Sequence, residues 1–147
     1  MSPRILLVDD AQDVRLIAQM SLERIGGWTV VPVASGEQAL RAVAEEAPFD
    51  AVLLDVMMPG MDGPSTLQQL RARGLPVEVK IVFLTAKAQG AELQRLRALG
   101  VAGVIAKPFD PLALPRRLDE MLNAPVGNGR RPFVEGTQRS GRLQLWK

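Results

Sequence analysis

Five short apolar runs, each followed by a helical pattern, constrain the fold of this chain more than any other feature. The runs are rich in Val, Ile and Leu, and they cover residues 4–8, 29–33, 51–54, 79–84 and 101–106. Several are almost continuously apolar, which is typical of strands covered on both faces. Five strand–helix units within about 120 residues predict an α/β fold: a five-stranded parallel sheet with right-handed crossovers and helices on both faces.

The helical patterns between these runs have recognisable starts and stops. Apolar residues recur at spacings of three and four within residues 14–25, 36–47, 64–73, 93–99 and 111–122. Ser35 is placed as an N-cap of the second helix, and Gly74 and Gly100 follow the third and fourth as C-terminal stops. Pro115 lies inside the fifth pattern, so we expect that helix to begin near residues 112–115 or to be kinked there.

The composition excludes several classes of chemistry. The chain has 147 residues, enough for one domain, and contains neither Cys nor His. It therefore has no disulfide framework, no thiol nucleophile and no Ser-His-Asp triad. No apolar run approaches the length of a membrane span, and no signal peptide precedes the first run, so we expect a cytoplasmic protein with no membrane partner.

The charge is divided unevenly between two parts of the chain. Residues 1–123 carry 13 Lys and Arg against 15 Asp and Glu, whereas residues 124–147 carry five basic residues against one acidic residue. We expect residues 1–123 to form the domain and residues 124–147 to be a basic linker and tail without a fold of its own. Because the high pI comes from the tail, we do not expect a nucleic-acid partner for the domain.

Polar side chains follow four of the five predicted strands. Asp9 and Asp10 come directly after the first, Asp55 after the third, Thr85 after the fourth and Lys107 after the fifth. The carboxyl ends of parallel strands meet at one edge of a sheet, where functional groups gather. The sequence therefore predicts three carboxylates, one hydroxyl and one ammonium group in a single cluster.

Such a cluster has a definite chemistry. Three neighbouring carboxylates repel each other and need a compensating cation, and carboxylate oxygens suit Mg²⁺. A carboxylate nucleophile beside a metal, a lysine and a hydroxyl donor describes a phosphoryl-transfer site. The expected cofactor is Mg²⁺.

Four motifs in order resemble those of response-regulator receiver domains of two-component signalling. They are Val8-Asp9-Asp10, Leu54-Asp55-Val56-Met57-Met58-Pro59-Gly60-Met61-Asp62-Gly63, Leu84-Thr85-Ala86 and Lys107-Pro108-Phe109. The resemblance covers about residues 4–122 and implies the flavodoxin-like (βα)5 fold that the periodicity also predicts.

The resemblance implies roles at the acidic edge. Asp55 would accept a phosphoryl group from the phosphohistidine of a partner histidine kinase or of a histidine phosphotransfer protein. Asp9, Asp10 and Asp55 would hold Mg²⁺, together with the backbone carbonyl of Met57.

It also implies the parts of a switch. Thr85 would move its hydroxyl toward the phosphoryl group, Ala86 would offer its backbone N–H, and Lys107 would pair with the phosphoryl oxygens, so that Asp55, Thr85 and Lys107 share the catalysis. The Lys107-Pro108 peptide would be cis. One departure is Val104, which stands where relatives usually carry an aromatic residue or His.

The output would be a change of protein-binding surface. In relatives this surface is the helix 4–strand 5–helix 5 face, here roughly residues 88–99, 102–106 and 111–122, which would contact a downstream protein or a second copy in a phosphorylation-induced homodimer.

Three other functions remain open at this point. A Mg²⁺-dependent phosphohydrolase could act through an aspartyl-phosphate on Asp55, although Met57 replaces the acid that such enzymes usually carry. A flavodoxin-type electron carrier would need a Ser- and Thr-rich phosphate loop where Asp9 and Asp10 stand. A nucleic-acid binder would have to act through the tail.

Overall fold

The computed structural model describes residues 3–124 and 133–134, and its centre is one parallel β-sheet. The strand order is β2-β1-β3-β4-β5-β6, and every neighbouring pair is parallel. The strands are β1 (Arg4–Val8), β2 (Thr29–Val33), β3 (Ala51–Asp55), β4 (Lys80–Thr85), β5 (Gly103–Ala106) and β6 (Phe133–Val134). The α/β architecture predicted from the five apolar runs is confirmed.

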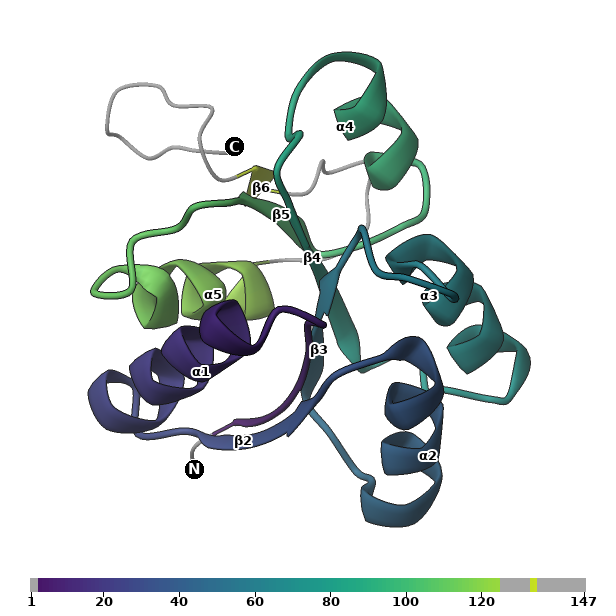
Figure 1. Ribbon diagram of the computed structural model, residues 1–147, viewed down its shortest axis with the longest axis horizontal. Coiled ribbons are helices and arrows are strands. Elements are labelled where there is room, and N and C mark those ends of the chain that lie inside the picture. Colours follow the sequence, from purple (N-terminus) through teal and green to yellow (C-terminus); the bar gives the residue numbers. More distant parts are fainter. Residues whose placement is uncertain (1–2, 125–132, 135–147) are drawn as a thin grey trace.

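Helices cover both faces of the sheet, as Figure 1 shows. One face carries α1 (Gln12–Met20), its π-helical continuation η1 (Ser21–Ile25) and α5 (Leu114–Asn123). The opposite face carries α2 (Gly36–Glu46), α3 (Gly63–Ala72) and α4 (Gly90–Arg97). The resulting three layers explain why β1, β3 and β4 are apolar almost throughout, since both faces of these strands are covered.

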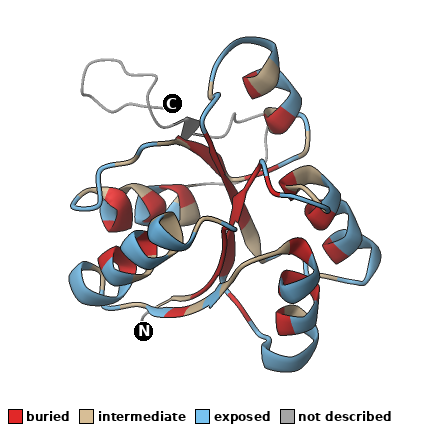
Figure 2. Ribbon diagram, in the orientation of Figure 1, coloured by how far each residue is buried: buried red, intermediate tan, exposed pale blue. Residues whose placement is uncertain are grey.

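Two hydrophobic clusters hold the layers together, one on each face of the sheet (Figure 2). Along β1 and β3 the side chains alternate between the clusters: Leu6 and Val52 belong to the cluster under α2, α3 and α4, and Leu7 and Leu53 to the cluster under α1 and α5. All four are fully buried. A rigid central sheet therefore supports the loops at its carboxyl edge.

The helix starts follow local chemistry. The Ser35 hydroxyl accepts the N–H of Gln38 at 3.1 Å, as predicted for the cap of α2, and the Asp62 carboxylate accepts the N–H of Ser65 at 2.8 Å at the start of α3. The fifth helix begins at Leu114, so Pro115 lies in the first turn, where its missing N–H has no helical partner to lose. Of the two predicted outcomes for α5, a late start is correct.

The structure corrects some boundaries and adds two features. The third strand extends to Asp55, and the fourth and fifth begin one and two residues later than predicted. The first helix changes to π-helical geometry at Ser21, whose hydroxyl donates to the carbonyl of Pro111. A short sixth strand, β6, pairs with β5 inside the segment predicted to be a tail. That pairing could not be read from two residues in a sequence without a strand pattern.

Helices that could cross a membrane are absent from residues 3–124, because none of the described helices is both long and apolar enough.

Candidate phosphoacceptor site

The carboxyl edge of the sheet brings three acidic side chains together. Asp9 and Asp10 follow β1, and Asp55 ends β3, the strand beside it. One carboxylate oxygen from each lies within 4.8 Å of the others. Asp9 and Asp55 are buried, whereas Asp10 is exposed to solvent. The cluster predicted from strand ends is therefore present, open to solvent on the side of Asp10.

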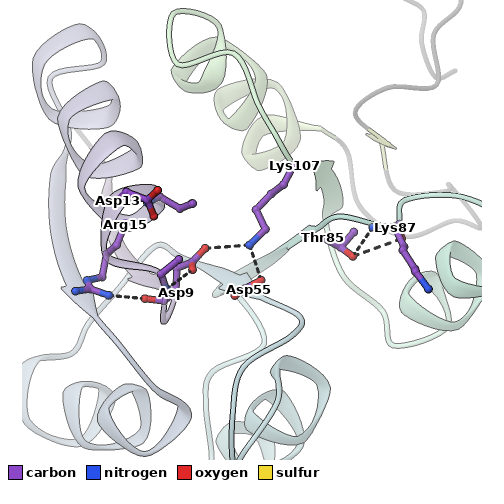
Figure 3. A network of polar contacts seen from close by, with 9 residues as sticks. Asp9, Asp13, Arg15, Asp55, Thr85, Lys87 and Lys107 are labelled. Atoms are coloured by element: carbon purple, nitrogen blue, oxygen red, sulfur yellow. Dashed lines mark hydrogen bonds and ion pairs between the residues drawn. The ribbon is translucent and has the colours of Figure 1, made fainter.

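Every polar group of Asp9, in its backbone and in its side chain, has a hydrogen-bond or ion-pair partner. Its backbone N–H donates to the carbonyl of Val33 at 3.2 Å, and its Oδ1 accepts a hydrogen bond from the N–H of Ala11 at 2.9 Å. Its Oδ2 lies 3.4 Å from the Nζ of Lys107, and its backbone carbonyl accepts a hydrogen bond from the Arg15 guanidinium at 2.7 Å (Figure 3). These contacts satisfy a fully buried carboxylate, which would otherwise be costly.

Lys107 links the two buried acids. Its Nζ lies 2.9 Å from Oδ1 of Asp55, and Figure 3 shows the side chain, which follows β5, reaching between Asp9 and Asp55. Burial would lower the pKa of Lys107, but the hydrogen bond with Asp55 and the charges of Asp55 and Asp9 outweigh it and raise the pKa. Lys107 therefore stays charged. The peptide that joins it to Pro108 is cis, as the resemblance implies.

Asp55 is the perturbed acid of the site. Burial, the largest cause, raises its pKa from 3.8 to about 6; the hydrogen bond from Lys107 opposes this, and the charge of Asp9 and the contact with Asp10 add to it. The carboxylate is therefore destabilised until more positive charge arrives. Lys107 alone does not balance three acids.

The loop after β3 is packed tightly beneath Asp55. The N–H of Gly63 donates to the Val56 carbonyl at 2.8 Å. A Cβ at Gly63 would lie 2.4 Å from the Asp55 carbonyl oxygen, so only glycine fits where α3 begins. Met57, predicted to offer its backbone carbonyl, lies in this loop and is 74% exposed.

Thr85 is at the same edge, but its hydroxyl is engaged elsewhere. It accepts the N–H of Lys87 at 3.0 Å and lies 3.4 Å from the Lys87 carbonyl, as Figure 3 shows. Ala86, the predicted backbone donor, is exposed. Val104 is fully buried on β5, so it cannot swing between core and surface as a large aromatic side chain could.

The donor set fits a hard divalent cation. Among the described residues, Asp9, Asp10 and Asp55 form the group of acidic side chains that could hold a metal ion. All three offer oxygen ligands, which Mg²⁺ prefers. The uncompensated negative charge and the raised pKa of Asp55 also favour a cation site, because a bound cation would stabilise the ionised form of Asp55.

Comparison with known proteins assigns the chain and its fold to a family. The family model of the response regulator receiver domain matches residues 5–119. This chain belongs to that family. Receiver domains are phosphoacceptor modules of signalling, and the match includes all four motifs found in the sequence.

Individual relatives and a solved structure support the membership of this family. The chain is 33% identical to the alkaline phosphatase synthesis transcriptional regulatory protein PhoP of Bacillus subtilis, over 99% of this chain and 61% of that protein. It is 34% identical to a probable chemotaxis protein CheY of Rhizobium etli, over 72% of this chain and 81% of that protein. The solved chemotaxis protein CheY4 of Vibrio cholerae superposes with a TM-score of 0.76 at 30% identity, over 83% of this chain and 100% of that one.

Many relatives are longer than this receiver domain. The chain spans about half the length of the transcriptional regulators that it matches, and 18% of the sensor protein GacS of Pseudomonas syringae, to which it is 41% identical. The same receiver domain thus occurs in proteins of different size and name.

Two residues of the site were missed by sequence reasoning. The sequence patterns do not single out Arg15, and they include Gly63 only as the last residue of the motif that begins at Leu54. The spacing of Arg15, five residues beyond Asp10 and just inside a helix, was the available signal, because a long side chain there can reach back past the N-terminus. The contact of Gly63 depends on how α3 meets β3, which no local pattern encodes.

Proposed function

We propose that this receiver domain is a phosphorylation-controlled signalling switch that accepts a phosphoryl group on Asp55. One observation carries the proposal: the Asp55 side chain is 3% exposed, pairs with Lys107 at 2.9 Å and shares the sheet edge with two further carboxylates. This arrangement combines a nucleophile with charge stabilisation for an incoming anion.

The proposed reaction is a transfer between side chains. An Asp55 carboxylate oxygen attacks the phosphorus of a phosphohistidine on a sensor histidine kinase or a histidine phosphotransfer protein. The P–N bond breaks, its electron pair stays on the imidazole, which takes up a proton, and an acyl phosphate forms on Asp55. Water later attacks that phosphorus, which releases inorganic phosphate and returns the carboxylate.

The chain's own residues hold the cation and the transferred oxygens. Asp9, Asp10, Asp55 and the Met57 carbonyl would bind Mg²⁺, which when bound neutralises charge on the phosphoryl oxygens. Lys107, which pairs with Asp55, supplies a second positive charge. Because its pKa is raised, it remains an ammonium throughout the neutral range.

The phosphoryl group would bias an existing equilibrium. It adds about −1.5 to −2 charges and strong acceptor oxygens, to which the Thr85 hydroxyl and the Ala86 N–H would donate. Thr85 would leave its bond with Lys87, and the loop before α4 would follow. Thr85 therefore acts through a change of partner.

The expected output is a change of protein contacts. We assign it to the α4–β5–α5 face, where a downstream protein or a second phosphorylated copy would dock. The kinase partner, the homodimer, the cytoplasmic location and the tail at residues 124–147 remain predictions. The phosphohydrolase alternative gains nothing from the family or the site, because Met57 offers no acid.

The test is modification by a small phosphodonor. Wild-type protein incubated with acetyl phosphate and Mg²⁺ should gain one phosphoryl group by mass spectrometry, and Asp55→Asn should gain none. Asp119→Asn, an exposed acid on α5, is the matched control and should label like wild type. Labelling of Asp55→Asn at the wild-type rate would contradict the assignment.

A further inference from the structure

Arg15 is the residue near the acidic cluster whose role the proposed function leaves unexplained. It lies in α1, one turn inside the helix, and its side chain turns back toward the end of β1 (Figure 3). Its guanidinium donates to the backbone carbonyl of Asp9 at 2.7 Å, across six residues of sequence. The contact is part-buried, where such a charge-assisted hydrogen bond is worth more than in water.

The bonded carbonyl belongs to the peptide that connects Asp9 to Asp10. On the Asp9 side, the side chain and the N–H are already held by Ala11, Lys107 and Val33. Asp10, by contrast, is exposed, and its side chain contacts Asp55 across the cluster. The peptide held by Arg15 is its anchor on the β1 side. Because the peptide unit is planar, fixing its carbonyl also fixes where the Asp10 Cα and its side chain start.

We propose that Arg15 is a positioning residue of the acidic site: by holding the Asp9–Asp10 peptide, it sets the direction from which the Asp10 carboxylate joins Asp9 and Asp55. The inference rests on the proposed function, since it concerns the cation site of the phosphoacceptor. Partners that orient metal ligands affect binding strongly, and their loss typically weakens metal affinity about 10- to 100-fold.

Charge and position make opposite predictions for Arg15, which makes the role testable. If its positive charge simply acts on the site, removing it will strengthen Mg²⁺ binding, because a repelling cation has been taken away. If Arg15 orients Asp10, removing it will weaken Mg²⁺ binding in spite of the charge change. The sign of the effect therefore separates the two roles.

The experiment uses Arg15→Met in the full 147-residue chain, since Met keeps the length and helix propensity of Arg but has no charge or donor. After removal of metal with a chelator, Mg²⁺ binding is measured by titration calorimetry for wild type, Arg15→Met and Arg24→Ala. Arg24 is an exposed arginine on the same helical segment and serves as the matched control. We expect a Kd about tenfold higher for Arg15→Met and an unchanged Kd for Arg24→Ala.

A second readout distinguishes positioning from general damage. With acetyl phosphate as donor, Arg15→Met should need about tenfold more Mg²⁺ for half-maximal labelling of Asp55, yet reach a labelling rate within about twofold of wild type at saturating Mg²⁺. If Arg15→Met does not fold, Arg15→Lys replaces it, with a smaller loss of the same sign expected because lysine lacks the planar fork.

The outcomes separate this inference from the proposed function. An unchanged or lower Kd for Arg15→Met, or for Arg15→Lys in its place, overturns the positioning role while leaving the phosphoacceptor intact. Wild-type protein that binds no Mg²⁺, or whose binding survives Asp10→Asn, overturns the proposed cation site and the positioning role with it.

Discussion

The two halves of the phosphoacceptor site differ in how firmly they are held. In the half formed by β1 and β3, Asp9 is bonded at its N–H, its carbonyl and both carboxylate oxygens, and Asp55 is paired with Lys107. In the half formed by β4 and α4, the Thr85 hydroxyl bonds to the backbone of the exposed residue Lys87, and the loop residue Ala86 is exposed. α4 itself has eight residues.

This difference matches a division of labour. Transfer chemistry needs preorganised groups, because charge stabilisation is most effective when the donors do not have to reorganise. A switch needs a segment that can change partners at low cost, and such segments come from the less stable parts of a fold. The first half is suited to the chemistry, and the second to the response.

The largest expected effect concerns the raised pKa of Asp55, in the half formed by β1 and β3. The folded pKa of Asp55 is about 6, above its usual 3.8, so the folded protein binds more protons than the unfolded chain between these values. Stability from this group is therefore present at low pH and lost as the pH rises through about 6. Without metal, Asp55→Asn should become more stable than wild type by on the order of 3 kcal/mol as the pH rises from 4 to 7.

Urea denaturation of both proteins in chelator at several pH values measures this difference. Mg²⁺ at neutral pH should reduce this stability difference, because wild type keeps the full acidic cluster and is stabilised more by the bound ion. If the difference in free energy of unfolding between the two proteins does not grow between pH 4 and 7, the folded pKa of Asp55 is not raised.

A second effect tests how tightly the first half is packed. Gly63→Ala places a Cβ 2.4 Å from the Asp55 carbonyl oxygen and 2.9 Å from the Val56 Cα, both of them backbone atoms. The free energy of unfolding should fall by about 2–3 kcal/mol, and Asp55 should label more slowly. The measurements are denaturant unfolding and acetyl phosphate labelling.

Gly90, at the start of α4, is the matched control in the other half. Its φ is +65° and no atom lies within 4 Å of an added Cβ, so Gly90→Ala adds backbone strain alone, about 1–2 kcal/mol. If Gly63→Ala costs no more than Gly90→Ala, the contrast between the two halves is not one of packing.

A smaller effect concerns the far end of α4. Arg71 of α3 donates to the carbonyls of Leu99 and Gly100 at 2.6 and 3.1 Å, which holds the C-terminal end of α4 against α3. Arg71→Gln should lower the free energy of unfolding by about 1 kcal/mol. Hydrogen exchange should show the loss of protection in α4, whereas the exposed Arg73→Gln should leave it unchanged. Equal protection in both variants would show that α4 does not depend on this contact.

The smallest stability effect is expected at Thr85. Thr85→Val removes a hydroxyl that bonds to the backbone of an exposed loop residue, Lys87. Water can replace this bond, so the free energy of unfolding should change by less than about 1 kcal/mol. Labelling of Asp55 should continue, but the chemical shifts of α4 amides should respond less to phosphorylation than in wild type. A full response in Thr85→Val would remove Thr85 from the switch.

Local sequence patterns predicted much of this fold and also which residues lie together at the candidate site. Strand ends placed Asp9, Asp10, Asp55 and Lys107 at one edge, because parallel strands bring their carboxyl ends together whatever the details of packing. The late start of α5 is one of the two outcomes predicted from Pro115, whose ring disfavours a helix interior. The change of helical geometry at Ser21 and the pairing of β6 depend on distant partners and left no periodic signal.

The sequence by itself determined the order of strands and helices, the acidic cluster and the family, because these depend on periodicity and on residue types at strand ends. Only the tertiary structure decided how each group is held: the Asp9 carbonyl by Arg15, the Asp55 backbone by the close approach of Gly63, and the Thr85 hydroxyl by Lys87. The physical reason is range. Periodicity is written within a few residues, whereas the distances that set a pKa or a ligand's direction arise between elements that meet only after the chain has folded.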